Sequence, residues 1–145
     1  MTIDLPDLMS MDALGARIAA KLRAGDVIAL SGDLGTGKTT LARAIIAALG
    51  HTGEVPSPSY TIIETYDDVT PPLVHADFYR LQDPAEVHEL GLDHYRNGAA
   101  LIAEWPDHAG GFADEPDCLS ILLKKVGDGR EAVVTVGETW QGRWP

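Results

Sequence analysis

The chain has 145 residues, of which 45% are hydrophobic and 23% charged, a balance typical of one globular domain rather than of a disordered or fibrous chain. Its 22 Asp and Glu residues outnumber its 11 Lys and Arg residues, which leaves a net charge of −11. The basic residues are scattered, and the largest groups are residues 21–23 and 124–125. Direct binding to the phosphates of DNA or RNA needs clustered cations, so direct nucleic-acid binding is disfavoured.

The single cysteine and the N-terminal sequence predict a cytoplasmic protein. Cys118 cannot form an internal disulfide, and its apolar neighbours favour a buried position. The first residues carry no signal-peptide pattern, and no stretch approaches the roughly 18 apolar residues of a membrane span. We therefore expect no membrane partner.

The first third of the chain predicts a helix, a strand, a glycine-rich turn and a second helix. Apolar residues recur every three or four positions across residues 11–22, as one face of an amphipathic helix requires, and Gly25 ends this pattern. Residues 26–31 form a short, nearly unbroken apolar run, typical of a strand buried on both faces. After the turn, a four-residue apolar spacing over residues 39–49 predicts the second helix.

The remainder of the chain alternates loops with short strands. The segment 51–59 holds Pro56 and Pro58, which exclude both a helix and a central strand. Asp83 followed by a proline predicts a short helix that Gly91 ends. Runs of apolar and β-branched residues predict strands at 60–66, 73–77 and 99–104 and a hairpin between 118–124 and 131–136.

Helices that alternate with short apolar strands indicate an α/β fold. We expect a three-layer sandwich in which helices cover a mostly parallel sheet that has an antiparallel edge. Residues 1–136 are assigned to this single domain. Residues 137–145 show no periodicity and form either a mobile tail or one that docks through Trp140 and Trp144.

Residues 32–39 read Gly-Asp-Leu-Gly-Thr-Gly-Lys-Thr and fit G-x-x-x-x-G-K-[ST], the pattern of a phosphate-binding loop between a strand and a helix. Glycines permit backbone conformations in which successive N–H groups surround a phosphate. Lys38 would reach the β- and γ-phosphates, and the Thr39 hydroxyl would face a Mg²⁺ between them. Thr40 is either a donor to the α-phosphate or a helix residue bonded to its own backbone.

Two carboxylates end predicted strands and are candidates for the metal side of this site. Asp77 closes the run 73–77, and Glu104 closes the run 99–104. In an open α/β sheet the ligand lies beyond the carboxyl ends of the strands, so both acids can face one metal. The spacing alone does not decide which of them ligates Mg²⁺ and which orients the attacking water, and a solvated acid at a strand end is the alternative for each.

The loop after the second helix contributes three hydroxyl residues, Ser57, Ser59 and Thr61. Segments at this position respond to the γ-phosphate in many switch proteins, and we consider the same role here. Local turns between serine side chains and the backbone explain the same residues equally well.

Four sequence blocks in this order resemble the TsaE family, small bacterial ATPases of tRNA threonylcarbamoyladenosine biosynthesis. The blocks are residues 32–40, Ser57-Pro58-Ser59-Tyr60, His75-Ala76-Asp77-Phe78-Tyr79-Arg80-Leu81 and Glu104-Trp105-Pro106. The Asp-Phe-Tyr-Arg and Glu-Trp-Pro blocks are more diagnostic than the phosphate loop alone. Ser59 stands where the family more often has threonine, a change that keeps the hydroxyl.

The resemblance implies a P-loop NTPase-like fold, with ATP and Mg²⁺ as ligands and slow ATP hydrolysis by the chain alone. It also implies two partners, the TsaD and TsaB subunits, on which the ATP-bound form docks. This pair transfers threonylcarbamoyl to adenosine 37 of tRNA, so tRNA is engaged only indirectly.

Site residues follow from the same resemblance, motif by motif. Lys38, Asp77 and Glu104 are implied to be catalytic, and Thr39, Glu104 and Asp77 to hold the metal. Trp105 is implied to lie beside the nucleotide. The residues implied to bind the nucleotide are Asp33, Leu34, Gly35, Thr36, Gly37, Lys38, Thr39, Thr40 and Gly129.

Two other functions share parts of this pattern. A small-molecule kinase of P-loop type has a similar loop and size, but it predicts an arginine-rich lid, and none is visible around Arg80 or Arg96. A nucleotide-sensing interaction module would need binding without useful turnover. Loss of turnover in a Glu104→Ala protein that still serves its partner would favour this module.

Overall fold

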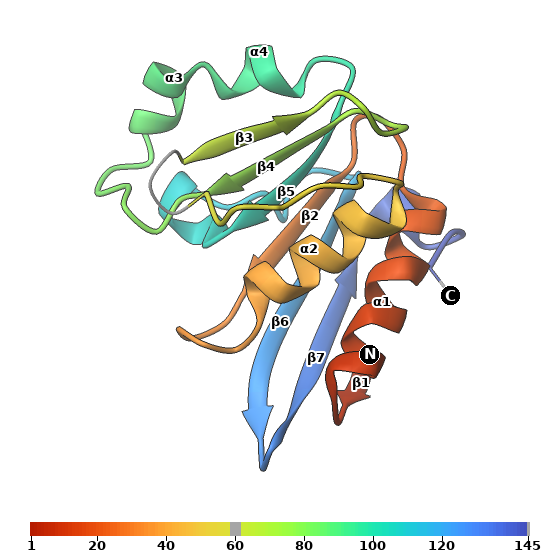
Figure 1. Ribbon diagram of the computed structural model, residues 1–145. Coiled ribbons are helices and arrows are strands. Elements are labelled where there is room, and N and C mark those ends of the chain that lie inside the picture. The colour runs from red at the N-terminus through yellow and green to blue at the C-terminus, as the bar shows by residue number, and fades with distance from the viewer. Residues whose placement is uncertain (59–61, 145) are drawn as a thin grey trace.

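The computed structural model describes residues 1–58 and 62–144, which form a seven-stranded sheet with helices packed against it (Figure 1). The strands are β1 (Thr2–Leu5), β2 (Val27–Ser31), β3 (Ile63–Tyr66), β4 (Leu73–Asp77), β5 (Ala100–Glu104), β6 (Cys118–Val126) and β7 (Gly129–Val136). The helices are α1 (Leu8–Lys21), α2 (Lys38–Ala48), α3 (Glu86–Leu90) and α4 (Leu92–Arg96), with short 3₁₀ helices η1 (Pro106–Ala109) and η2 (Glu138–Trp140).

The strand order is β1-β7-β6-β2-β5-β4-β3. The pairs β6–β2, β2–β5 and β5–β4 are parallel, whereas β1–β7, β7–β6 and β4–β3 are antiparallel. The strands β1, β2, β4, β5 and β6 therefore run in one direction and β3 and β7 in the other, which confirms the mixed α/β class and the mostly parallel sheet. Antiparallel pairing occurs at both edges of the sheet rather than at one.

Helix α1 begins earlier than its apolar spacing indicates, because a capping box sets its first turn. Asp7 accepts a hydrogen bond from the Ser10 N–H at 2.8 Å, and the Ser10 hydroxyl accepts one from the Asp7 N–H at 3.2 Å. Further along, α1 crosses α2 at Gly15, where an added Cβ would lie only 2.5 Å from the Cβ of Ala44. A glycine is therefore needed for the two helices to approach this closely.

The two faces of the sheet carry separate apolar clusters. Alternate strand residues such as Ile28 and Ile102 pack against α1 and α2, which lie over the front of the sheet in Figure 1. The intervening residues, such as Ala29 and Leu101, form a second cluster with Leu92 of α4. This alternation is the period-2 pattern of strands that are covered on both faces.

The C-terminal segment lies against the core at the end of the sheet where β2 begins. Trp140 is fully buried, and its Nε1–H donates to the main-chain oxygen of Asp117 at 2.9 Å. Arg143 donates to both carboxylate oxygens of Asp26, at 2.8 and 2.7 Å, and both side chains are buried. Trp140 and Arg143 thus hold this segment against the rest of the chain.

The sequence pattern did not indicate the edge strand β1, the short helix α4 or the 3₁₀ helices η1 and η2. The predicted strand 60–66 corresponds to β3. Residues 60 and 61 of that prediction lie outside the described residues. Within 1–58 and 62–144, no helix combines the length and apolar content needed to cross a bilayer.

Candidate functional site

The glycine-rich loop of residues 32–37 connects β2 to α2 in backbone conformations that favour glycine. Gly32, Gly35 and Gly37 have φ angles of 137°, 79° and 103°. A Cβ on Gly32 would lie 2.5 Å from the main-chain oxygen of Leu123 in β6. Glycine is therefore required at Gly32 both by the backbone conformation and by the close approach of β6.

Helix α2 starts directly at the end of this loop without a side-chain cap. Its N-cap is Gly37 in the left-handed region, and among the described residues no side-chain capping hydrogen bond is formed at this end. The first N–H groups of a helix lack intrahelical partners and carry the positive end of the helix dipole. This end of α2 can therefore receive an anion.

Lys38, the first residue of α2, folds back over the loop. Its Nζ donates hydrogen bonds of 2.8 Å to the main-chain oxygens of Gly32 and Asp33, and it lies 4.4 Å from the ring centroid of Trp105. Burial lowers the pKa of the Lys38 ammonium, and the carboxylates of Glu104, Asp77 and Asp33 oppose this shift in that order. The lysine is thus a partly desolvated cation held beside acidic groups.

The next residue, Thr39, joins the loop to the acidic strand ends. Its hydroxyl donates a hydrogen bond of 2.7 Å to Oε1 of Glu104, the last residue of β5. The other oxygen of Glu104 lies 2.6 Å from Nε2 of His75 in β4, a contact that is buried on both sides. Glu104 is therefore a carboxylate at 2% exposure with one partner on each oxygen.

The second predicted acid, Asp77, lies beside Glu104 at the carboxyl end of the sheet. The two residues are partners in the β4–β5 register, so their side chains leave the sheet on the same face. Asp77 is 6% exposed and accepts a hydrogen bond of 2.9 Å from the Tyr79 N–H through Oδ1. The structure thus brings Lys38, Thr39, Asp77 and Glu104 to one place.

A cavity of about 310 Å³ lies over these groups. Leu34, Gly35, Gly37, Lys38, Thr39, Thr40, Asp77, Glu104, Trp105 and Arg130 line it. Most residues predicted to bind the triphosphate or the metal are therefore on its wall. Asp33 and Thr36 are not: Asp33 is exposed and lines a separate hollow beside β6, and the Thr36 hydroxyl donates to the Asp33 main-chain oxygen at 2.9 Å.

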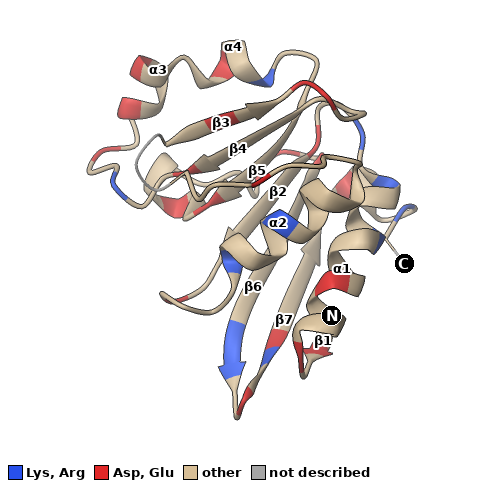
Figure 2. Ribbon diagram, in the orientation of Figure 1, with Lys and Arg blue, Asp and Glu red and all other residues tan. Residues whose placement is uncertain are grey.

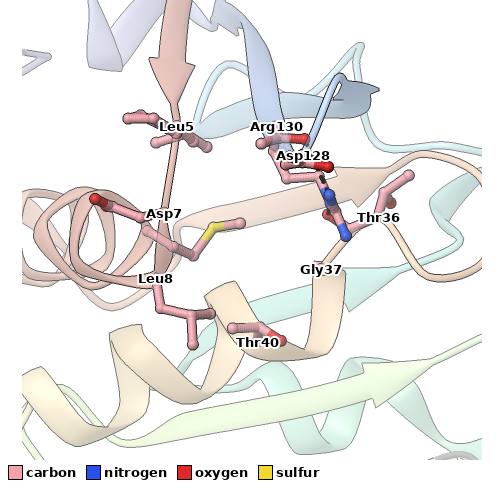
Figure 3. A pocket seen from close by; sticks show the side chains of 11 residues that line it. Leu5, Asp7, Leu8, Thr36, Gly37, Thr40, Asp128 and Arg130 are labelled. Carbon is pink, nitrogen blue, oxygen red and sulfur yellow. Dashed lines mark hydrogen bonds between the residues drawn. The ribbon is translucent and has the colours of Figure 1, made fainter.

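A second pocket of about 200 Å³ adjoins the first (Figure 3). It lies between the end of β1 and the start of α1, which contribute Leu5 and Leu8, and the start of β7, which contributes Gly129. The two hollows share Gly37, Thr40 and Arg130. Gly129 and Thr36, which were predicted near the nucleotide, line this second pocket.

Arg130 is a site residue that the sequence pattern did not indicate. From β7 its Nε donates to the main-chain oxygen of Thr36 at 3.1 Å, and a terminal nitrogen donates to that of Gly35 at 3.2 Å. The other terminal nitrogen donates to the Gly129 main-chain oxygen at 2.9 Å. One planar guanidinium therefore ties the hairpin to the glycine-rich loop.

Basic residues that are scattered along the sequence lie close to the glycine-rich loop in the fold. Figure 2 shows basic positions near the ends of β6 and β7 that meet in the hairpin turn and at the start of α2. Lys125 of β6 approaches Gly35, since a Cβ on that glycine would lie 3.4 Å from its Nζ. The fold thus brings Lys38, Lys125 and Arg130 close to the glycine-rich loop in a chain whose net charge is −11.

The predicted switch-like loop is only partly described. Ser57 is half-buried and is not among the residues that line the two hollows. Ser59 and Thr61 lie outside the described residues. The switch role stays a prediction.

The donor set around Glu104 suits a hard cation. Thr39, Asp77 and Glu104 offer hydroxyl and carboxylate oxygens, which Mg²⁺ prefers over nitrogen or sulfur. No group of three or more His, Cys, Asp or Glu side chains in 1–58 and 62–144 is arranged to hold a metal by itself. A nucleotide-dependent magnesium site needs no such group, because phosphates and waters complete the coordination.

Comparison with known proteins places the chain in a family. Residues 5–132 match the family model described as "Threonylcarbamoyl adenosine biosynthesis protein TsaE". The chain is 40% identical to the tRNA threonylcarbamoyladenosine biosynthesis protein TsaE of Streptomyces coelicolor, over 90% of this chain and 93% of that protein. It is 38% identical to that of Haemophilus influenzae, over 82% and 79% of the two chains.

A solved structure agrees with the sequence matches. The crystal structure of YdiB, described as from Bacillus subtilus, superposes with a TM-score of 0.81 at 32% identity, covering 98% of this chain and 89% of that one. The family model, these relatives and this shared fold together establish that the chain belongs to the TsaE family of tRNA threonylcarbamoyladenosine biosynthesis.

Proposed function

We propose that this chain is the Mg²⁺-dependent ATPase of tRNA threonylcarbamoylation. In this proposal it has a P-loop NTPase-like fold, binds ATP at the glycine-rich loop and hydrolyses it slowly. The ATP-bound form docks on the TsaD–TsaB pair, which modifies adenosine 37 of tRNA. Membership of the TsaE family supports the pathway, and the site geometry supports the chemistry.

The observation that carries the proposal is the hydrogen bond of 2.7 Å between Glu104 and Thr39, the second residue of α2. P-loop enzymes hold Mg²⁺ between the hydroxyl that follows the loop lysine and a carboxylate on a neighbouring strand. Thr39 and Glu104 occupy these two positions and already contact each other. This contact favours Glu104 over Asp77 as the direct ligand.

Each group would have a distinct task when ATP is bound. The loop N–H groups and Lys38 would hold the β- and γ-phosphates, which requires Lys38 to leave the oxygens of Gly32 and Asp33. Bound Mg²⁺ would neutralise charge on these phosphates. Asp77, next to Glu104 in the sheet, would orient the attacking water.

The second pocket suits the nucleoside part of the ligand. It adjoins the phosphate cavity through Gly37 and Thr40, and Leu5, Leu8 and Met11 give it an apolar wall. A base can rest on such a wall while the phosphates point toward α2. This placement supports the predicted position of Gly129 near the nucleotide.

Docking on partners requires that ATP changes the surface of the chain. Lys38 and Trp105 line the cavity, and the Tyr79 ring, which is 48% exposed, packs against the Trp105 ring. Movement of Lys38 onto a phosphate would remove a cation from the Trp105 ring. The surroundings of Trp105 and Tyr79 would thus differ between the nucleotide-bound and nucleotide-free protein, and a partner could distinguish the two states there.

The test combines binding, turnover and docking in one set of proteins. We expect immobilised TsaD–TsaB to retain the chain in the presence of a non-hydrolysable ATP analogue and Mg²⁺, and to release it in ADP. Glu104→Ala should abolish turnover. If this variant still supports tRNA modification, binding without turnover suffices and the hydrolytic step of the proposal is wrong.

A matched control removes an acid that lies away from the site. Asp67→Ala changes an exposed carboxylate in the β3–β4 turn and should leave retention and turnover unchanged. Rapid phosphate transfer from ATP to a metabolite without partners would identify a small-molecule kinase and overturn the proposal.

A further inference from the structure

His75 is a buried polar residue to which the proposed function assigns no task. It lies in the middle of β4 with a fully buried side chain, two residues before Asp77. Its side chain leaves the sheet on the same face as those of Asp77 and Glu104, because strand side chains alternate and β4 pairs with β5 in register. A polar side chain at such a position normally has a hydrogen-bonding reason to be there.

Its contact is a short hydrogen bond to Glu104. Nε2 of His75 lies 2.6 Å from Oε2 of Glu104, with both side chains shielded from solvent. The carboxylate accepts, so His75 donates the Nε2 proton. Nδ1 has no hydrogen-bond partner among the described residues, which suits a ring that carries its proton on Nε2 and leaves Nδ1 as an acceptor.

The two oxygens of Glu104 are thereby given different tasks. Oε2 is bound to His75 inside the sheet, whereas Oε1 contacts Thr39 at the cavity. A carboxylate held by one oxygen cannot rotate freely about its last torsion. The free energy of a charge-assisted hydrogen bond in a buried setting is large enough to fix this orientation.

We propose that His75 is a positioning residue that holds Glu104 with Oε1 toward Thr39 and Mg²⁺. The inference rests on the proposed function, because it gives Glu104 its direction toward the metal. Groups that hydrogen-bond to a metal-binding carboxylate orient it and adjust its basicity. His75 does this from within β4, without contact with the nucleotide.

The experiment compares two amide replacements that differ in reach. In His75→Gln the side-chain amide can occupy the place of Nε2 and donate to Glu104. In His75→Asn the amide is one methylene shorter and matches Nδ1 instead, so the bond is lost at a similar cost of polar burial. His75→Leu, apolar and of similar volume, replaces the asparagine variant if that protein does not fold.

The measurement is the Mg²⁺ dependence of ADP binding by titration calorimetry, with EDTA as the metal-free reference. We expect His75→Asn to raise the Mg²⁺ concentration needed for half of the affinity gain by about 10- to 100-fold. Metal-free ADP affinity should stay unchanged, and His75→Gln should resemble the unmodified protein. The kcat and the KM for ATP are then measured for the same variants.

Three other results would overturn the role of His75 or the metal site itself. Equal Mg²⁺ dependence in the glutamine, asparagine and unmodified proteins overturns the positioning role while leaving the proposed function intact. Equal loss in the glutamine and asparagine variants also overturns it, because shape rather than the donor would then matter. If the unmodified protein binds ADP with no Mg²⁺ dependence at all, the proposed metal site itself is wrong.

Discussion

The guanidinium of Arg130 donates a hydrogen bond of 3.1 Å to the main-chain oxygen of Thr36, and so joins the β6–β7 hairpin to the glycine-rich loop. A second bond, to the oxygen of Gly35, fixes the same turn of the loop. The loop therefore receives its shape partly from a residue more than 90 positions away in the chain. Its conformation depends on β7 as well as on its own glycines.

Replacement of Arg130 by methionine should weaken ADP binding. Hydrogen bonds that involve a charged group contribute about 1.5–3 kcal/mol, so we expect roughly a tenfold or larger loss of affinity by calorimetry. Arg130→Lys keeps the charge but not the fork of donors, and should give an intermediate value. Arg96→Gln, which removes an arginine paired with Glu115 instead, should leave the affinity unchanged; a loss of similar size there would contradict the assignment.

Lys38→Ala should reduce ATP affinity by about tenfold or more, because a charge-assisted contact to phosphate is lost. The protein should stay folded, because the ammonium contacts two main-chain oxygens of the loop and the Trp105 ring, and no described residue of the apolar core. Calorimetry measures the affinity, and circular dichroism checks the fold. Lys21→Ala, in the exposed last turn of α1, is the matched control. Unchanged affinity in the Lys38 variant would remove Lys38 from the binding site.

Asp77→Ala should lower Mg²⁺-dependent turnover more than nucleotide binding. Its carboxylate lies beside Glu104, and in the proposed function it orients the attacking water and does not hold phosphate. A steady-state assay should therefore show a fall in kcat with little change in ATP affinity. Equal losses in both quantities would contradict this role.

Arg143→Met should destabilise the protein strongly. It would leave the Asp26 carboxylate, which is 2% exposed, without the cation that contacts both of its oxygens. Breaking a buried pair from one side costs about 3–5 kcal/mol, which urea unfolding can measure. The double variant Asp26→Asn with Arg143→Met should recover part of that loss. A change of only a few tenths of a kcal/mol would mean that the docked C-terminal segment contributes little.

The His51–Asp68 pair predicts a pH-dependent contribution to stability. Its hydrogen bond to Asp68 raises the pKa of His51, and the same bond lowers the pKa of Asp68. A raised histidine pKa stabilises the folded state below the ordinary value of about 6.5, and this contribution is lost as the pH rises through the raised pKa. Asp68→Asn should therefore destabilise the protein more at about pH 6 than at about pH 9.

The direct measurement is an NMR titration of the His51 ring. In Asp68→Asn the pKa of His51 should fall toward its ordinary value. Asp67→Asn, which changes the neighbouring exposed acid, serves as the control. A His51 pKa that is the same in all three proteins would show that the pair does not form in solution.

Much of the site could be predicted because its parts are local in sequence. Residues 32–39 combine a buried strand, a glycine-rich turn and a helix start, and each follows from spacing and composition. Asp77 and Glu104 were identifiable because each ends an apolar run. Their adjacency needed only the rule that parallel strands end at the same edge of a sheet.

The residues that escaped prediction act through contacts between distant segments. β1 is four residues long and gains its order from pairing with β7, which local propensity does not register. Arg130 faces the glycine-rich loop only because of the register of the β6–β7 hairpin. His75 stood out as part of a motif, but its bond to Glu104 depends on the β4–β5 alignment.

The position of Trp105 makes its fluorescence a probe of Lys38 at the glycine-rich loop. The indole ring lies 4.4 Å from the Lys38 ammonium, on a backbone held at a φ of 55°, whereas Trp140 and Trp144 contact Asp117 and Met1 elsewhere in the fold. Indole fluorescence responds to a nearby positive charge. Emission from Trp105 should therefore shift when Lys38 leaves the main-chain oxygens of Gly32 and Asp33 and binds a phosphate. The rate of nucleotide binding can then be measured by stopped-flow fluorescence without an added label.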